Sequence, residues 1–291
     1  MRVGLRVCVN TLHGALEGVP NLLRLFNEYQ IQASFFFAMG PDNSGRIFSE
    51  NAKHPWVKER PIQRRLGDFF RSPPHMSRKA AQIMRSTVSD GHEVGLLGYD
   101  RTAWVKKGAF ADKNWTQRHI GLAMEEFEAV MQNRPKAFAA AGWQVNPFLF
   151  ALEQDLDLEY ASDTRGKSVF CPVLQDIKSA CPQVPTTLPT LSGMLSVEGV
   201  TRENVHEYLY AESQYVLPNG HVYSLDAEME GMDYLPFMEK LVIMWKGFGE
   251  GLGGLAEAVN GIEKTACRYH QVGWQAEEGT GVHQAWQSLM L

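Results

Sequence analysis

The residues with reactive side chains show few of the spacings that catalytic sites usually have. The four cysteines form no CxxC pair, so buried free thiols are expected rather than a zinc finger or a disulfide framework; they are Cys8, Cys171, Cys181 and Cys267. Cys8 could act as a nucleophile if a base lowered its pKa, and His13 is near it in sequence. No third residue that would orient this pair is apparent. A small side chain filling space at a strand end is therefore the plainer interpretation.

A cluster of basic and aromatic residues indicates a surface for anions. Between residues 51 and 85 nine basic residues meet only two acidic ones, although the whole chain has a formal net charge of -5. Trp56, Phe69 and Phe70 lie among these cations. The mixture suits an anionic membrane surface or a lipid phosphate, and a solvated helical face is the alternative. Nucleic acid fits less well, because the acidic remainder of the chain would repel it.

The elements that must position these residues alternate between strands and helices. Strands are expected over 3–9, 33–38, 93–97, 137–143, 158–162 and 221–225, and helices over 18–30, 116–131, 147–154 and 236–245. The basic stretch 51–90 is expected to be helical, with a break at Pro73 and Pro74. This alternation predicts an α/β fold with a parallel sheet, and one domain of this length favours a barrel. The glycine-rich tail after Gly247 gives no clear pattern.

The length and composition are those of one globular domain. A chain of 291 residues, 44% of them hydrophobic, can bury one large core, and no Gly-, Ser- or Pro-rich linker divides it. No run approaches the roughly 20 apolar residues that a membrane span needs. Arg6 interrupts the apolar start, so no signal peptide is expected and a cytoplasmic location follows by default.

Short motifs that occur in a fixed order between about residues 3 and 231 carry a family resemblance. They are GLRVCVNT (4–11), GVP (18–20), IQAS (31–34), GPDN (40–43), HEVGL (92–96), AAGW (140–143), SDTRG (162–166), VPTTLPT (184–190) and AEMEG (227–231). By these motifs the chain resembles the polysaccharide deacetylase (NodB-homology) family. It is most similar to the ArnD-type deformylases, which act on formamido-arabinose carried by undecaprenyl phosphate. The resemblance implies a distorted (β/α)7 barrel as one domain over 1–291, with a basic-aromatic helical insertion at about 46–88, and a divalent metal as the family's cofactor.

The positions that perform the family's chemistry carry different side chains in this chain. In the family one aspartate is the catalytic base, a second aspartate and two histidines bind the metal, an arginine supports the base, and a histidine is the acid. The resemblance places these roles, in the same order, at Cys8; at Asn10, Leu97 and Arg101; at Gln144; and at Asp226. All six residues differ from the family's, while the flanking motifs remain.

These replacements remove the donors that a metal requires. A catalytic divalent ion needs about three protein ligands with lone pairs and one open position. Leu97 has no lone pair, Asn10 has only a neutral amide oxygen, and Arg101 brings a permanent positive charge. At about 4 Å and an effective dielectric of about 20, that charge would repel a divalent ion by about 8 kcal/mol. No metal or other cofactor is therefore expected; Arg101 and Asp226 either pair with each other or both reach solvent.

Other positions keep the family's residues and could line a sugar pocket or hold the loops in place. Trp143 suits stacking on a sugar ring, and Arg165 suits a phosphate or carboxylate. His92 is expected to make a structural hydrogen bond, because at strand spacing it faces away from the site. The candidate substrate-binding residues are Asp100, Arg101, Trp143, Asp163, Arg165 and Glu228, with Glu230 retained beside them.

These observations favour a catalytically degenerate homologue, a pseudoenzyme that binds a lipid-linked amino sugar or regulates a related lipid-modifying enzyme. The expected partners are the lipid-linked sugar or an anionic membrane surface, met through the Lys53–Arg85 segment on the inner face of the inner membrane, and an active paralogue. The alternative is a hydrolase that still cleaves a carbon–nitrogen amide bond. It would use a metal-independent route or a metal moved to Asp100, Asp226 and Glu228.

Overall fold

Parallel strands form the centre of the protein. The computed structural model describes residues 2–44, 73–247, 249, 251–260, 267–277 and 281–291, and it orders the strands β5-β4-β3-β2-β1-β8. Their bounds are β1 Arg2–Val9, β2 Ser34–Phe37, β3 Glu93–Leu96, β4 Ala137–Phe138, β5 Tyr160–Ala161 and β8 His221–Asp226. A further strand, β9 (Gly251–Gly253), pairs in parallel with the first residues of β1. The predicted α/β fold with a parallel sheet is confirmed.

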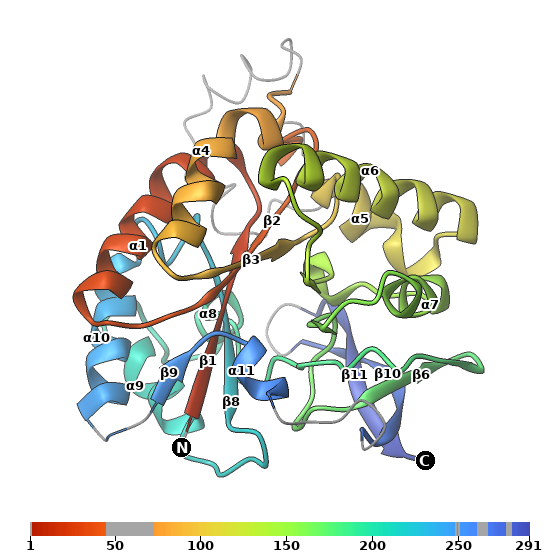
Figure 1. The fold of residues 1–291 in the computed structure, drawn as a ribbon. Coiled ribbons are helices and arrows are strands. Elements are labelled where there is room, and N and C mark those ends of the chain that lie inside the picture. Colours follow the sequence, from red (N-terminus) through yellow and green to blue (C-terminus); the bar gives the residue numbers. More distant parts are fainter. Residues whose placement is uncertain (1, 45–72, 248, 250, 261–266, 278–280) are drawn as a thin grey trace.

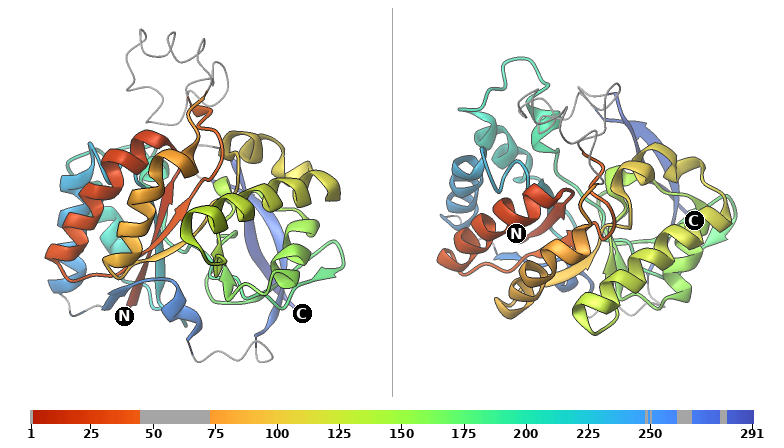
Figure 2. Two further views of the ribbon diagram at one scale, coloured as in Figure 1. Left: turned by 45° about the horizontal axis from the view of Figure 1, so that its top comes forward. Right: turned by 90° about the horizontal axis from the view of Figure 1, so that it is seen from above.

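Helices connect successive strands and surround the sheet (Figure 1; Figure 2). The longer ones are α1 (Val19–Glu28), α4 (Met76–Ser89), α6 (Lys113–Met131), α7 (Pro147–Asp155), α9 (Val205–Glu212) and α10 (Leu235–Gly247). The shorter ones are η1 (Gly14–Gly18), α5 (Arg101–Lys107), η3 (Gly108–Phe110), η4 (Ala141–Trp143), α8 (Leu191–Met194) and α11 (Ala256–Val259). On α1 the residues at helical spacing, Val19, Leu22 and Phe26, are buried, as the sequence pattern predicts.

A second sheet contains the C-terminal part of the chain, which the sequence pattern left unassigned. The antiparallel hairpin of β10 (Tyr269–Ala276) and β11 (His283–Met290) joins β6 (Cys171–Leu174) and β7 (Ile177–Lys178) in the order β11-β10-β6-β7. The backbone N–H of Arg165 donates to the carbonyl of Ala285, and that of Gln287 donates to the carbonyl of Arg165, both at 2.8 Å. The hairpin is therefore bound directly to the segment that follows β5.

Two of the predicted elements differ from the structure, in whole or in part. The strand expected over 137–143 is only the two residues of β4, because the backbone turns into the left-handed region at Gly142 (φ 64°) and Trp143 (φ 52°). Of the predicted basic helical stretch, α4 begins shortly after Pro74, while residues 51–72 lie outside the described part of the chain. None of the described helices combines the length and the apolar character that a membrane crossing requires.

The expectations for His92 and for the cysteines are confirmed. His92 is buried and its Nδ1 accepts a hydrogen bond from the backbone N–H of Ala33 at 3.1 Å. Its ring also packs against those of Phe26 and Phe35, so it stabilises the contact between α1 and the sheet. All four cysteines are buried and free.

Candidate functional site

Three strands bring five of the six replaced positions to one end of the barrel. β1 pairs with β8, placing Cys8 opposite Asp226, and β2 joins β1 to β3. Leu97 follows β3, and Arg101 begins α5 four residues later. Because the carboxyl ends of parallel strands meet at one edge of a sheet, these side chains converge there. This is the end at which the active sites of barrel enzymes are built.

Asn10 lies at the centre of this cluster and joins a cation to two carboxylates. Its Oδ1 accepts a hydrogen bond from Nε of Arg101 at 2.7 Å. Its Nδ2 donates to Oδ1 of Asp226 at 2.7 Å and to Oε2 of Glu228 at 3.2 Å. The amide therefore presents its acceptor to the guanidinium and its hydrogens to the acids. Asn10 and Arg101 are only 6% and 9% exposed, so this network is largely shielded from water.

The donor set at this place does not fit a divalent cation. The Asn10 oxygen is used by Arg101, and the N–H groups of Asn10 point toward the carboxylates that a metal would need. Leu97 is 1% exposed and belongs to the apolar core. Across the described ranges, no three histidine, cysteine, aspartate or glutamate side chains gather in a way that could hold a metal ion. The chemistry of the side chains, rather than any missing ion, argues against the family's metal here.

Glu228 is committed to holding the loop that follows β1. Its Oε1 accepts hydrogen bonds from the backbone N–H groups of Asn10 (2.9 Å) and Thr11 (2.7 Å) and from Oγ1 of Thr11 (2.9 Å). A Cβ added at Gly14 would lie 2.2 Å from this same Oε1. The π-helical turn η1 can therefore pack on the carboxylate only because residue 14 has no side chain.

The three acids at and just after the end of β8, Asp226, Glu228 and Glu230, favour their protonated forms more than free carboxyls do. Burial, and then the charge of Asp226, raise the pKa of Glu228 to about 7 and that of Glu230 to about 8. Burial also raises the pKa of Asp226, and Arg101 and Asn10 oppose that rise. Glu230 accepts from the Tyr223 hydroxyl at 2.7 Å and from the Asp226 N–H at 3.0 Å. The cluster therefore holds protons around neutral pH.

A Glu230→Gln variant should lose less stability than the wild type as the pH rises. The folded chain keeps the Glu230 proton up to about pH 8, whereas the unfolded carboxyl, with a pKa of 4.5, has released it. The folded state binds more protons between these values, so stability is fully present at low pH and falls as the pH rises through this window. Over about pH 5 to pH 8.5 the loss from Glu230 is roughly 2–5 kcal/mol. Urea unfolding at both pH values measures it.

Glu125→Gln, on an exposed turn of α6, is the control for this experiment. Histidines with lowered pKa, such as His119 at about 4, act in the opposite direction below pH 6.5, but they are common to all three proteins. Equal pH dependence of unfolding in Glu230→Gln and in the wild type would contradict the assignment.

Cys8 does not have the environment of a nucleophile. Its thiol accepts from Nη1 of Arg6 at 2.9 Å and lies 3.7 Å from Oγ of Ser224. Burial raises the pKa of Cys8 to about 11, so the thiol stays protonated at neutral pH. His13 lies 3.2 Å from Glu17 on the partly exposed turn η1. The plainer interpretation, a small side chain at a strand end, fits the structure.

Several of the candidate residues hold loops in place. Asp100 caps α5 by accepting from the Ala103 N–H at 2.9 Å, and it accepts from Nδ2 of Asn43 at 2.7 Å. Asp163 is 0% exposed, and its oxygens accept from the Ala140 N–H and from Nε2 of Gln183. Both oxygens of each carboxylate therefore already accept a hydrogen bond from the protein.

Two more candidates lie in the turn after β4 and beside it. Nε2 of Gln144 donates to the carbonyls of Gly142 and His283, joining the turn after β4 to the start of β11. The guanidinium of Arg165 lies 5.2 Å from the ring centroid of Trp143. Arg165 and Trp143 are therefore neighbours. They come from the connections that follow β5 and β4, which are consecutive strands.

Arg6 and Trp286 are the functional candidates that the sequence reasoning missed. Arg6 is 1% exposed, donates to Ser224 at 2.7 Å and lies over the ring of Trp143 at 5.4 Å. The signal for Arg6 was present, because it lies on the face of β1 opposite the alternating Leu5 and Val7, and that face also carries Cys8. No sequence pattern predicted that Trp286, on β11, would contact Arg165.

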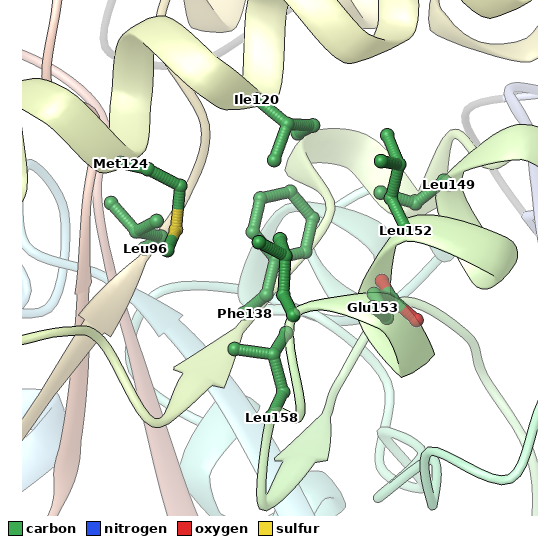
Figure 3. A pocket seen from close by; sticks show the side chains of 9 residues that line it. Leu96, Ile120, Met124, Phe138, Leu149, Leu152, Glu153 and Leu158 are labelled. Carbon is green, nitrogen blue, oxygen red and sulfur yellow. The ribbon is translucent and has the colours of Figure 1, made fainter.

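A small pocket between α6, α7 and the sheet is not a candidate site. Its walls are apolar apart from the carboxyl of Glu153, as Figure 3 shows, and its volume is about 10 Å³. Burial, and then the charge of Asp163, raise the pKa of Glu153 well above its ordinary value. A space for about one water molecule with one polar wall residue is a packing gap rather than a ligand site.

Comparison with known proteins gives the class to which this fold belongs. No established family model matches the sequence. A polysaccharide deacetylase crystal structure from Mycobacterium smegmatis has a TM-score of 0.61 at 15% identity and covers 89% of this chain and 88% of that one. A CE4-family pseudoenzyme from Bacillus anthracis has a TM-score of 0.53 at 13% identity, covering 89% and 65%; one of its mutants is described as having restored enzymatic activity. The architecture is therefore the NodB-type distorted barrel of the polysaccharide deacetylases.

A curated relative defines the branch within that class. The protein named 4-deoxy-4-formamido-L-arabinose-phosphoundecaprenol deformylase ArnD in Shewanella sediminis is 30% identical over 264 residues, which cover 84% of this chain and 81% of that protein. This chain belongs to the ArnD-type branch of the polysaccharide deacetylase (NodB-homology) family. The resemblance inferred from the sequence motifs is thereby confirmed.

Proposed function

We propose that this chain is a binding member of its family that does not perform metal-dependent amide hydrolysis. One observation carries the proposal: the hydrogen-bonded chain from Arg101 through Asn10 to Asp226 and Glu228 fills the place where the resemblance puts the metal. A guanidinium there supplies the positive charge that the carboxylates require. The charge balance of the site is therefore maintained without an ion, and no ligand position is left for a metal-bound water.

The alternative is a hydrolase with a relocated metal, and the contacts of Asp100 count against it. Asp100 spends its oxygens on Ala103 and Asn43, whereas Asp226 and Glu228 turn theirs to Asn10. Asp100 therefore has other partners than Asp226 and Glu228, which share Asn10, and the three carboxylates are not among any group in the described residues that could hold a metal ion. A metal-independent route would need an activated nucleophile, and the protonated thiol of Cys8 does not supply one.

The ligand that we propose is an amino sugar carried on a polyprenyl phosphate. Its support is the activity stated in the name of the Shewanella relative, a deformylase for formamido-arabinose on phosphoundecaprenol. The walls of the barrel keep Trp143 and Arg165, side chains suited to a sugar ring and to an anion. The roles that we propose for this binding are sequestration of the lipid-linked sugar, regulation of a lipid-modifying enzyme, or stabilisation of an active paralogue. The structure from Bacillus anthracis is named a pseudoenzyme, so loss of catalysis has a precedent on this fold.

Calorimetric titration with a short-chain polyprenyl-phosphate 4-formamido-arabinose tests this proposal, followed by an assay for formate in the same sample. We expect saturable binding and no formate above the level of a protein-free control, with or without added zinc. Formate release that depends on the protein would support the hydrolase instead. Absence of binding would remove the proposed ligand.

We further propose that the protein works as a peripheral protein on the inner face of the membrane. The predicted Lys53–Arg85 contact falls mostly outside the described residues, but a second feature supports this placement. Phe110 is 93% exposed in η3, and the exposed cations Lys106, Lys107 and Lys113 flank it. This segment leaves the carboxyl end of β3, the same end as the site. An aromatic residue among lysines suits an anionic bilayer surface.

A Phe110→Ser variant should bind vesicles containing phosphatidylglycerol about tenfold more weakly than the wild type, because the ring no longer enters the interface. Replacing Lys106 and Lys107 by Glu should have at least as large an effect and remove the preference over phosphatidylcholine vesicles. Vesicle sedimentation measures both. The matched control is Val216→Ser, since Val216 is 89% exposed before the amino end of β8, at the opposite end of the barrel. Equal losses in Phe110→Ser and Val216→Ser would contradict the docking surface.

A further inference from the structure

A buried guanidinium inside the barrel has hydrogen-bond donors that nothing uses. Arg165 is 5% exposed, and its Nη2 donates to the carbonyl of Leu188 at 2.7 Å. Within the described ranges, no group accepts a hydrogen bond from its Nε or its Nη1. These two nitrogens lie on different sides of the guanidinium, because Nη1 is on the side of Cδ and Nε–H is on the side of Nη2, so each can donate separately to an oxygen acceptor. Leaving them unpaired in a buried place is costly, so a partner is expected.

Two indole N–H groups beside Arg165 are also unpaired. The guanidinium lies 5.2 Å from the ring centroid of Trp143 and 5.5 Å from that of Trp286. Nε1 of each tryptophan is buried and has no acceptor among the described residues. Trp143 holds a left-handed backbone conformation (φ 52°), which is unfavourable for a residue with a large side chain and indicates that its ring position is imposed. The segment after β5, the turn after β4 and β11 thus contribute unused donors to one place.

Among the described residues, neither buried guanidinium at this place donates a hydrogen bond to a carboxylate. Arg6, also buried, lies over the same Trp143 ring and donates to Ser224, Cys8 and the Ala140 carbonyl, all of them uncharged. Burial lowers the pKa of Arg165 to about 10, and Arg6 adds to that fall, while Glu277 opposes it. Arg165 is still a cation at neutral pH. Asp163 and Asp226 act on Arg6 and Glu277 acts on Arg165 only through their charges, so an anion bonded directly to Arg165 is expected.

We propose that Nε and Nη1 of Arg165, with the indole N–H groups of Trp143 and Trp286, form a binding site for an oxyanion, a phosphate ester or a carboxylate carried by the ligand. The inference deepens the proposed binding function and rests on it for the identity of the whole ligand, but not for the anion itself. Donors outnumber acceptors among the unpaired buried groups of this region: two guanidinium nitrogens and two indole N–H groups, against the amide oxygen of Gln284 and the hydroxyls of Thr164 and Thr186. An uncharged hydroxyl as ligand would leave the guanidinium of Arg165 without an anion bonded to it. A phosphate or carboxylate satisfies both the hydrogen bonds and the charge.

Titration calorimetry with inorganic phosphate and with sodium acetate, in the absence of metal and sugar, tests the site. The wild type should bind at least one of them saturably, and the stronger of the two identifies the kind of oxyanion. Arg165→Met should weaken that binding about tenfold or more, since the positive charge and the N–H donors of the guanidinium are lost. Trp286→Phe, which keeps a ring but removes the N–H, should weaken it about threefold to tenfold.

Two variants match these changes elsewhere. Arg202→Met removes an exposed guanidinium that lies over Tyr234, and Trp274→Phe changes the other tryptophan of the same hairpin. Neither should alter anion affinity. The melting temperature of anion-free Arg165→Met should equal or exceed that of the wild type, because an unbalanced buried charge has been removed.

Several results would overturn this site. They are no saturable binding of either anion, unchanged affinity in both Arg165→Met and Trp286→Phe, or an equal loss in Arg202→Met. The assay contains no amide to hydrolyse, so its failure is distinct from the formate result that would refute the wider proposal.

Discussion

The variant Asn10→Asp, Leu97→His and Arg101→His should bind one zinc ion per chain, whereas the wild type should not. The three changes restore a carboxylate and two imidazoles at the positions that the resemblance assigns to the metal, and they delete the guanidinium that contacts Asn10. Removing that charge relieves a repulsion of about 8 kcal/mol at about 4 Å and an effective dielectric of about 20. Three ligands and one open position are what a catalytic zinc site uses.

The metal-free triple variant should be less stable than the wild type, because the new aspartate stands beside the carboxylates of Asp226 and Glu228. Zinc should then raise its melting temperature, since a ligand that binds only the folded state stabilises it. Equilibrium dialysis with elemental analysis gives the stoichiometry, and thermal unfolding gives the stabilisation.

The control for this prediction is the variant Leu97→His with Arg101 retained. It adds an imidazole but keeps the opposing charge, so it should bind no zinc. If the triple variant folds and still binds no zinc, the three positions do not converge on one coordination centre. The assignment of positions 10, 97 and 101 to the family's metal site is then wrong.

The second large effect is expected from Arg101→Met at alkaline pH. Arg101 is the cation bound to the Asn10–Asp226–Glu228 network, and its loss leaves buried carboxylates uncompensated. Breaking a buried charge network by removing one partner costs about 3–5 kcal/mol. Urea unfolding at about pH 8.5 should show a loss of this size, because the acids are then most strongly driven to ionise.

The pH dependence and a second substitution identify the cause. Without Arg101 the pKa of Asp226 rises further above its unfolded value of 3.8. The folded variant is therefore most stable at low pH, where Asp226 is protonated, and it loses stability more steeply than the wild type as the pH rises. At about pH 5 the difference should fall to roughly 1–2 kcal/mol. Arg101→Met combined with Asp226→Asn should recover most of the loss at high pH. A cost below about 1 kcal/mol at every pH would mean that both groups act as exposed surface charges.

The parts of the fold that sequence reasoning predicted well are those with a strong apolar period. The alternation of β1 and the helical stripe of α1 follow from which side chains must be buried, and both are as expected. The site was located through sequence motifs because its residues follow strand ends, and strand ends of a parallel sheet meet at one edge. The pairing of Cys8 with Asp226 spans more than two hundred positions, and only the register of β1 with β8 establishes it.

The remaining features depend on information that local patterns do not carry. β10 and β11 are largely half-exposed, so their residues lack a clear apolar period, and their pairing with β6 joins distant segments. The role of Asn10 as the bridge between Arg101 and Asp226 depends on side-chain rotamers. The expected choice was direct pairing or exposure, and the structure shows a shielded network with the amide between the two charges.

Metal analysis of the wild-type chain tests the central claim most directly. The protein is purified without chelators, dialysed against zinc and then against metal-free buffer, and measured for bound metal beside its Asp226→Asn variant. We expect far less than one ion per chain in both, because a guanidinium and a leucine occupy the places of imidazoles. One zinc ion per wild-type chain that disappears in Asp226→Asn would contradict it.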